Sequence, residues 1–265
     1  EMARSVGRVE IKRVDGPYDS IGTAFVVDQK IPLAVTACHV VEKYIIKNPT
    51  GKWQLKPGHG LLLDFGLTVT DHHAADEFEI LELDFLPGIR GCDGVILKFS
   101  AAGKSVPARL PVSTIAPPEK WNKNAYAFSI GYPSAELGPT AATSITRGYF
   151  DCLRGEVGSR VSKFAFGGMV SGVARKEKYS VFRHNIPTTV GQSGSPVIAL
   201  EEDGRWRVTG IHVCCRDTIA SAYGNECGWR DELFDQTAVS LHDFLQLYKA
   251  GQLTGGWKLN SDSGR

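Results

Sequence analysis

The sequence predicts an all-β protein, built from antiparallel strands in a sandwich or barrel, with one helix near the C-terminal end. The main observation is a series of short β-rich runs, many of them separated by glycine, proline and asparagine. A proline-bearing stretch divides these runs into two groups, and an apolar stripe with helical spacing follows the last run. The runs are residues 22–27, 33–37, 61–69, 77–85, 95–99, 125–130, 179–182, 196–200 and 206–213.

Size and charge limit the possible functions. The chain has 265 residues, 42% of them hydrophobic, which suffices for one large all-β domain or two small subdomains with a sizeable core. Its 30 basic residues nearly balance 29 acidic ones, so a net charge of +1 creates no basic field for nucleic acid or an anionic membrane. No apolar run approaches the roughly 18–20 residues of a membrane helix. We therefore expect no nucleic-acid or membrane partner.

Cysteine usage and the first residues favour an intracellular setting. The first 18 residues contain no apolar stretch typical of a signal peptide. The spacing of the six cysteines indicates no disulfide framework, so we expect free thiols. Cys214 and Cys215 are adjacent on an expected strand and would point to opposite faces, which disfavours a shared zinc ion. We expect no metal and no cofactor. The cysteines are Cys38, Cys92, Cys152, Cys214, Cys215 and Cys227.

The order of the runs predicts four segments. Residues 1–106 form a first β-rich unit, and residues 107–124, which contain four prolines, form a linker across the surface. Residues 125–251 form a second β-rich unit that ends in the helix, and residues 252–265 form a polar tail that frays. Ser240 caps the helix with Asp243 three residues later, and Gly251 ends it. Its apolar stripe is Leu241, Phe244, Leu245 and Tyr248.

The motif Gly191-Gln-Ser-Gly-Ser-Pro196 is the most informative part of the chain. A Gly-x-Ser-Gly turn directs two backbone N–H groups and one hydroxyl into the same small space, as acyl transfer requires. A lone serine among small residues is usually part of an ordinary turn. Here the motif is followed by a β run and a hairpin that ends in Gly210-Ile-His-Val213. We therefore interpret Ser193 as a nucleophile.

A serine hydroxyl needs a base beside it to become a nucleophile. His39, in Thr36-Ala-Cys-His39, follows an apolar run and is the candidate base. An isolated histidine would more often be a core residue, but the downstream serine reverses that preference. His184 is a rival because it precedes Ser193 closely. The intervening chain is interpreted as one strand and loop, which brings His184 no closer to the hydroxyl.

An aspartate that orients the histidine completes the candidate group. We prefer Asp93, because it lies just before the apolar run Val95-Ile-Leu97, which would bury it against the imidazole. Asp-Gly is also a common turn dipeptide, and five other aspartates lie between His39 and Ser193. These alternatives are Asp64, Asp71, Asp76, Asp84 and Asp151.

Taken together, these residues resemble the chymotrypsin-like (trypsin-like) serine proteases from about residue 22 to residue 248. The resemblance implies an all-β fold of two antiparallel six-stranded β-barrels with a C-terminal helix, His39 and Asp93 on the first barrel and Ser193 on the second. It implies an oxyanion hole formed by the N–H groups of Gly191 and Ser193. It also implies a serine endopeptidase that acts on polypeptide substrates.

Within that family, the second barrel is most similar to glutamyl endopeptidases and viral polyprotein proteases. Both share a threonine five residues before the nucleophile and a Gly-Ile-His-like segment, here Thr188 and His212. The resemblance implies that this pair hydrogen-bonds a glutamate or glutamine in P1, the residue whose carbonyl is attacked. The alternative for His212 is a buried strand histidine bonded to a neighbour.

Some positions depart from the family pattern. Gln192 replaces the acid that activated trypsins pair with a freed N-terminus, so we expect a pocket that forms without cleavage. Cys214 and Cys215 follow Val213 where relatives often carry glycine, and their side chains would narrow the entrance of the S1 pocket. We expect Val213 and Cys215, with Thr188 and His212, to bind the substrate. We therefore expect a serine endopeptidase that cleaves after Glu or Gln. A protease with a different P1 preference and an inactive protease-like binding module are the alternatives.

Overall fold

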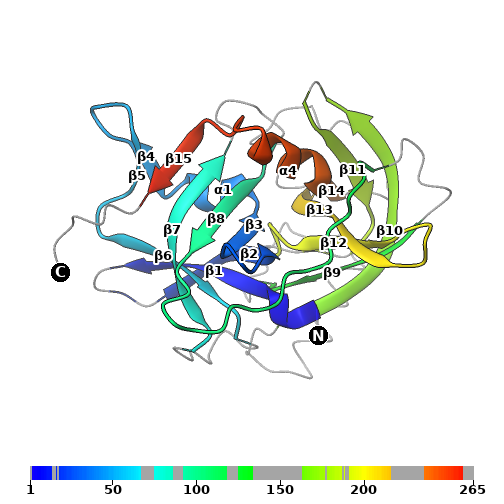
Figure 1. The fold of residues 1–265 in the computed structure, drawn as a ribbon, viewed down its shortest axis with the longest axis horizontal. Helices are drawn as coiled ribbons and strands as arrows, with labels where there is room; N and C mark the ends of the chain where they lie inside the picture. The colour runs from blue at the N-terminus through cyan, green and yellow to red at the C-terminus, as the bar shows by residue number, and fades with distance from the viewer. Residues whose placement is uncertain are drawn as a thin grey trace.

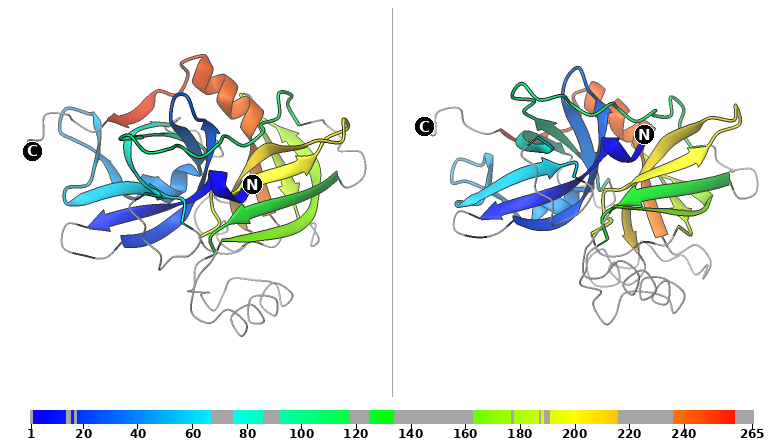
Figure 2. Two further views of the ribbon diagram at one scale, coloured as in Figure 1. Left: turned by 60° about the horizontal axis from the view of Figure 1, so that its bottom comes forward. Right: turned by 90° about the horizontal axis from the view of Figure 1, so that it is seen from below.

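Two closed six-stranded antiparallel β-barrels lie side by side (Figures 1 and 2). In Figure 2 the first barrel runs from blue to blue-green and the second from green through yellow to orange. This architecture confirms the fold class predicted from the sequence. The computed structural model describes residues 2–13, 16, 18–66, 75–85, 92–117, 125–133, 163–176, 178–186, 188, 191–215 and 236–258.

The first barrel follows a short 3-10 helix, η1 (Met2–Ser5), and has the strand order β7-β6-β1-β2-β3-β8, closed by pairing of β7 with β8. The first residues of β7 pair with β6 and its later residues pair with β8. A side hairpin, β4 (Ile45–Lys47) and β5 (Trp53–Leu55), extends from it. The barrel strands are β1 (Val6–Arg13), β2 (Tyr18–Asp28), β3 (Leu33–Thr36), β6 (His59–Asp64), β7 (Glu77–Phe85) and β8 (Val95–Phe99).

Strand β1 is buried on both faces because it also borders the second barrel. Val9 and Ile11 pack into the apolar core. On the same strand, the buried side chains of Arg8 and Glu10 form an ion pair, and Arg8 also pairs with Asp64 of β6. Charged side chains survive burial only when they are paired in this way. The Arg8 guanidinium also lies 6.0 Å from the ring centre of Tyr132, which follows β9 of the second barrel.

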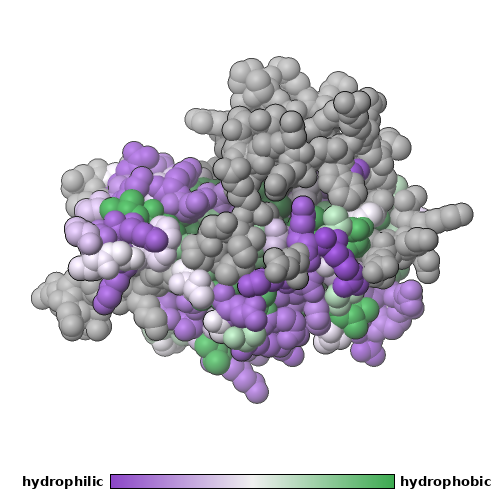
Figure 3. Space-filling view, turned by 90° about the horizontal axis from the view of Figure 1, so that it is seen from above, coloured by the Kyte–Doolittle hydropathy of each residue, from purple (hydrophilic) through white to green (hydrophobic). Residues whose placement is uncertain are grey.

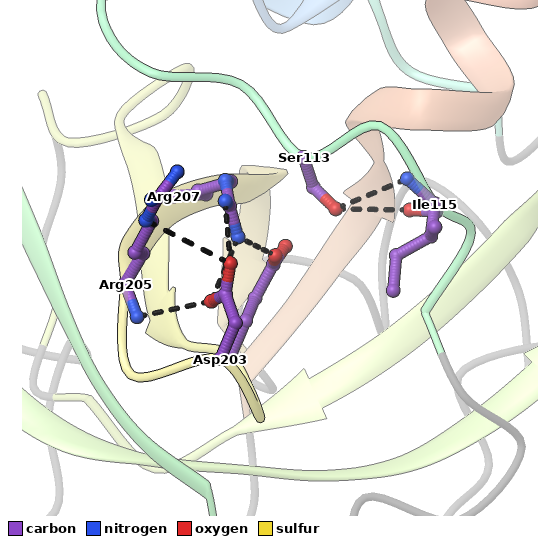
Figure 4. A network of polar contacts seen from close by, with 6 residues as sticks. Ser113, Ile115, Asp203, Arg205 and Arg207 are labelled. Atoms are coloured by element: carbon purple, nitrogen blue, oxygen red, sulfur yellow. Dashed lines mark hydrogen bonds and ion pairs between the residues drawn. The ribbon is translucent and has the colours of Figure 1, made fainter.

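The second barrel has the strand order β10-β11-β14-β13-β12-β9 and is closed by pairing of β9 with β10. The β12–β13 hairpin turns at Asp203-Gly204, as that dipeptide predicts. The Arg207 guanidinium pairs with Asp203 across this turn (Figure 4). The strands are β9 (Ala125–Gly131), β10 (Phe164–Arg175), β11 (Ser180–His184), β12 (Pro196–Leu200), β13 (Trp206–Cys215) and β14 (Gln236–Ser240).

The C-terminal helix α4 (Leu241–Lys249) leads the chain from the second barrel back to the first (Figure 1). Its Ser240 cap accepts a hydrogen bond from the Asp243 N–H at 3.2 Å, as predicted. Phe244 is fully buried and lies against Gly94, where an added Cβ would be 2.9 Å from the ring. The helix therefore packs beside the residue that follows Asp93.

Two segments differ from their sequence-based expectations. Residues 252–265 were expected to fray, but Gly255–Lys258 forms β15, which pairs with Glu82–Phe85 of β7 beyond the end of β6. That edge would otherwise leave backbone groups of β7 unpaired.

The strand expected over residues 61–69 is shorter than predicted. Strand β6 ends at Asp64, whose carboxylate accepts a hydrogen bond from the Gly66 N–H at 2.6 Å and so turns the chain. Residues 67–69 lie outside the described part.

The described part of the linker connects the two barrels. The Leu110 N–H donates to the Val26 carbonyl of β2 at 3.0 Å, and the Ser113 N–H donates to the Val208 carbonyl of β13 at 3.0 Å. The Ser113 hydroxyl then closes a small turn with Ile115 (Figure 4). Leu110 is buried, so this proline-rich stretch is anchored at both barrels.

The described surface is mostly polar. Figure 3 shows small green areas separated by purple on one face. The large hydrophobic residues exposed among the described ones are Ile31, Ile115, Tyr126 and Trp206. No helix in the described part of the chain is long and apolar enough to cross a membrane.

Candidate active site

His39 and Asp93 meet because the strands next to them pair. His39 lies on the short helix α1 (Cys38–Glu42) just after β3, and Asp93 lies just before β8. Thr36, near the end of β3, is in register with Val95 at the start of β8. This register brings His39 and Asp93 together. His39 Nδ1 lies 2.5 Å from Asp93 Oδ2, and the His39 backbone N–H donates to Asp93 Oδ1 at 2.8 Å.

This contact fixes the imidazole and changes its proton affinity. Burial disfavours the charged ring, but the hydrogen bond and the negative charge of Asp93 outweigh burial, so the pKa of His39 lies above its ordinary value of 6.5. Because Nδ1 faces Asp93, Nε2 is left to face another group. The rival Asp64 pairs with Arg8, and the rivals Asp71 and Asp151 lie outside the described residues.

The Ser193 turn is shaped by two glycines with positive φ, Gly191 at 91° and Gly194 at 89°. The Gly194 N–H donates to the His212 carbonyl at 2.7 Å, and the Ser195 N–H donates to the Gln192 carbonyl at 2.9 Å. The first bond holds the turn against β13, and the second closes the turn itself. A Cβ on Gly194 would lie 2.1 Å from the Thr23 carbonyl oxygen, so both the conformation and the space require glycine.

Two backbone donors beside the Ser193 hydroxyl have no acceptor among the residues that the structure describes. Within the described part of the chain, neither the Gly191 N–H nor the Ser193 N–H donates a hydrogen bond. Both belong to the turn that presents the hydroxyl. An arrangement of this kind stabilises negative charge that develops on an oxygen next to the nucleophile.

The Ser193 turn and the His39 helix lie on either side of Gly22. A Cβ on Gly22 would lie 2.7 Å from both methyl carbons of Val40 and 3.1 Å from the Ser193 carbonyl oxygen. Likewise, a Cβ on Gly194 would lie 3.0 Å from the Ala37 nitrogen. No hydrogen bond joins His39 to the Ser193 hydroxyl in the described structure. In proteases such bonds often tighten only when substrate is bound.

His212 and Thr188, the residues predicted to bind the P1 side chain, have hydrogen-bond partners that the sequence analysis did not predict. His212 Nδ1 lies 3.1 Å from His184 Nε2, and the Thr188 hydroxyl donates to Gln236 Oε1 at 2.5 Å. No hydrogen bond joins Thr188 to His212 among the described residues. His184, Gln236 and His212 come from the neighbouring strands β11, β14 and β13. The spacing of these residues in the sequence does not predict their contacts, because the contacts depend on strand register.

Burial keeps both histidines of this pair neutral. Desolvation, reinforced by the nearby His39, lowers the pKa of His212 to about 3. Desolvation and the neighbouring His212 lower the pKa of His184 well below its ordinary value. His184 Nδ1 is buried and has no hydrogen-bond partner in the described structure.

The remaining predicted site residues are placed as follows. Val213 is 6% exposed, on β13 directly after His212. Cys215 is the last residue of β13, and its side chain lies outside the described part. Cys38 and Cys92, next to His39 and Asp93, are free thiols. Burial raises the pKa of the Cys92 thiol to about 12, which makes it a poor nucleophile. No cluster of metal-binding side chains exists among the described residues.

The fold and this arrangement define a class. Two six-stranded barrels, a histidine held by an aspartate on the first and a Gly-x-Ser-Gly turn on the second are the features of a chymotrypsin-like serine endopeptidase. The sequence profile of the trypsin-like peptidase domain matches residues 22–211, well over half of the chain. The chain therefore belongs to the trypsin-like peptidase family.

Solved structures agree with this assignment. The thermostable serine protease AL20 from an extremophilic microorganism has a TM-score of 0.55 at 13% identity, with 96% of this chain and 99% of that chain covered. A Glu endopeptidase has a TM-score of 0.53 at 12% identity, with 94% of this chain and 91% of that chain covered. At these identities the likeness shows the fold. A search of the curated proteins found no match.

Proposed function

We propose that this serine endopeptidase hydrolyses peptide bonds with Ser193 as nucleophile, His39 as general base and acid, and Asp93 as the residue that orients His39. The observation that carries this proposal is the His39–Asp93 contact, with Nδ1 2.5 Å from Oδ2, together with a serine turn whose two N–H groups have no acceptor in the described part of the chain. His39 Nε2 removes the hydroxyl proton as Ser193 attacks the carbonyl carbon. The N–H groups of Gly191 and Ser193 stabilise the resulting oxyanion.

The second half of the reaction reuses the same groups. His39 returns the proton to the leaving amine, which departs and leaves an acyl group on Ser193. Water then attacks that ester, His39 accepts the water proton, and the acid product is released. The carboxylate of Asp93 stabilises the imidazolium, because both of its oxygens accept hydrogen bonds from His39.

A peptide library tests this proposal directly. The wild-type protein is expected to cleave a subset of peptides at defined bonds, and a fluorophosphonate probe is expected to label Ser193. Absence of cleavage together with absence of labelling would favour the inactive binding module. Cleavage that persists unchanged in Ser193→Ala would reject Ser193 as the nucleophile.

We further propose that His212 and Thr188 select glutamate or glutamine at P1. The likeness to the Glu endopeptidase named above concerns the fold alone. The proposal therefore depends on this chain's own residues. If His184 Nε2–H donates to His212 Nδ1, the unpartnered His184 Nδ1 carries only a lone pair, and His212 Nε2 carries a hydrogen. The opposite arrangement would bury an N–H without an acceptor, which is the costlier outcome. His212 is therefore a donor suited to a P1 side-chain oxygen.

We predict that glutamine is preferred over glutamate at neutral pH by about tenfold in kcat/KM. Among the described residues, the titratable groups that act on His184 and His212 are other histidines, His212 on His184 and His39 on His212. A P1 carboxylate would therefore be buried against neutral imidazoles. Thr188 already donates its hydrogen to Gln236, so its oxygen can accept from a glutamine amide but gains nothing from a carboxylate. Paired peptides that differ only in P1 Gln, Glu or Leu measure the preference.

The variants His212→Leu and Thr188→Val complete that measurement. In each variant, we expect the ratio of kcat/KM for P1 Gln to kcat/KM for P1 Leu to fall about tenfold. Both variants should keep the fold of the wild type, so cleavage after other P1 residues stays measurable. Tyr126→Phe, which removes a hydroxyl from a residue 68% exposed, serves as the control. A P1 profile that is the same in wild type and His212→Leu would refute the role of His212, and a glutamate preference would refute the neutral pocket.

We predict that kcat/KM for a P1 Gln peptide rises with pH through an inflection above 6.5. The base must be neutral to accept a proton, and Asp93 raises the pKa of His39, so the active form predominates only above that raised value. A pH–rate profile with an uncharged substrate measures the inflection. An inflection at or below 6.5 would contradict the assignment of His39 as the base.

A further inference from the structure

We propose that the side chain of Thr23 is a positioning residue, which holds the oxyanion turn of the second barrel in its working conformation from the first barrel. This inference rests on the proposed function, because it assigns a role within the same site. Thr23 lies in the middle of β2 and is completely buried. It touches the turn but not the reacting atoms.

Thr23 makes two bonds to the turn that presents Ser193. Its backbone N–H donates to the Ser193 carbonyl at 2.9 Å, and its hydroxyl donates to the Gly191 carbonyl at 2.9 Å. Two carbonyls of the turn are thus drawn toward the first barrel. Among the described residues, the N–H groups of Gly191 and Ser193 are left without acceptors, as an oxyanion hole requires.

The hydroxyl of Thr23 also receives a hydrogen bond. The Tyr132 N–H, just after β9, donates to Thr23 Oγ1 at 3.1 Å. The Thr23 carbonyl accepts from the Thr36 hydroxyl at 2.6 Å, which fixes this part of β2 next to the end of β3. The side chain therefore joins two separate segments of the second barrel while its backbone is held by the first.

The Gly191 peptide needs such an external restraint. Glycine at a φ of 91° has no side chain to limit rotation, so its own geometry does not select one direction for its carbonyl and N–H. The surroundings are also tight: a Cβ on Gly131 would lie 2.1 Å from the Ser195 hydroxyl oxygen and 3.2 Å from Thr23 Oγ1. Loss of the Thr23 hydroxyl would leave the Gly191 carbonyl and the Tyr132 N–H without their partner in a closely packed interior.

This role accounts for a departure seen in the sequence. Gln192 stands where activated trypsins carry the acid that pairs with a freed N-terminus. In this chain, bonds from Thr23 supply a restraint on the turn that requires no cleavage. The restraint is present as soon as the two barrels pack together.

The test compares Thr23→Val with Thr23→Ser. Valine keeps the branched shape and removes both hydroxyl bonds, whereas serine keeps the hydroxyl and removes only a methyl group. We expect Thr23→Val to lower kcat about 10- to 100-fold, less than complete loss of an oxyanion-hole donor, with KM changed by less than about threefold. Thr23→Ser should stay within about threefold of wild type. Thermal unfolding of each variant is measured in parallel.

A pair of inhibitors separates positioning from a merely structural role. A peptide aldehyde forms a tetrahedral adduct on Ser193 whose oxygen occupies the oxyanion hole, whereas the matching peptide alcohol binds without forming an adduct. Thr23→Val is expected to weaken the aldehyde about as much as it lowers kcat/KM, and to leave the alcohol's inhibition constant unchanged. Equal weakening of both inhibitors would overturn the proposal, as would a Thr23→Val variant with wild-type kcat.

The folding of Thr23→Val, the activity of Thr23→Ser and the activity of the wild type also test the proposal. If Thr23→Val does not fold, Thr23→Cys replaces it, because a thiol fills a similar space and is a weak hydrogen-bond donor. If Thr23→Ser falls as far as Thr23→Val, the hydroxyl is not the group that matters and the inference fails. A wild-type protein that cleaves no peptide would overturn the proposed function, whereas an active wild type with an unaffected Thr23→Val overturns only this inference.

Discussion

Replacement of Ser193 by alanine is expected to lower kcat by about 10⁶-fold, the largest effect of any single change in this chain. The hydroxyl is the only group in the proposed mechanism that forms a bond to the substrate, so His39 and the two backbone donors cannot replace it. Single-turnover and steady-state assays with a P1 Gln peptide measure the loss. Residual cleavage arises only from binding and the oxyanion hole.

The neighbouring serine offers a matched control. Ser195 lies in the same motif, and its buried hydroxyl has no hydrogen-bond partner in the described structure. Ser195→Ala should keep kcat within about fivefold of wild type, because it removes no interaction that develops in the transition state. Ser193→Ala should keep the fold, since its described hydrogen bond is made by its backbone carbonyl to Thr23. Equal losses in the two variants would contradict the assignment of the nucleophile.

Replacement of Asp93 by asparagine is expected to lower kcat by about 10⁴-fold. Asp93 accepts from the His39 backbone N–H through one oxygen and faces Nδ1 through the other. Asparagine can present an amide N–H to Nδ1 instead, which would place the imidazole hydrogen on Nε2, where the base must be free to accept a proton. The charge that stabilises the imidazolium is lost as well. Steady-state kinetics above pH 7 measure the effect.

A second aspartate distinguishes this role from a general effect of charge. Asp76 is one of the alternative acids; it directly precedes β7, and its backbone carbonyl accepts a hydrogen bond from the Phe65 N–H at 3.0 Å. Asp76→Asn makes the same chemical change and should leave kcat within about twofold. The proposed triad would be wrong if Asp93→Asn stayed within about tenfold of wild type while it remained folded.

Local sequence patterns predicted much of the fold but missed several strands. Runs with clear β composition, such as Val95–Phe99 and Pro196–Leu200, are strands at nearly the expected residues. Strand β1 was missed because Arg8 and Glu10 interrupt its apolar pattern. Their burial in this strand is stabilised by the ion pairs that Arg8 forms with Glu10 and Asp64. Strand β10 contains Gly167, Gly168 and Gly172, which disfavour a strand by composition. Neighbouring strands stabilise both segments.

The sequence alone determined the all-β class, because short β-rich runs show in local composition. It also determined the candidate residues and the turn chemistry, because Gly191, Ser193 and Gly194 act through their own backbone and side-chain properties. The tertiary structure decided which partners meet. His184 reaches His212, Thr188 reaches Gln236, and Thr23 reaches Gly191 only after strands pair in register and two barrels pack together. A single sequence does not encode such pairs as a local pattern, since the free energy that selects a contact comes from the whole packed interior.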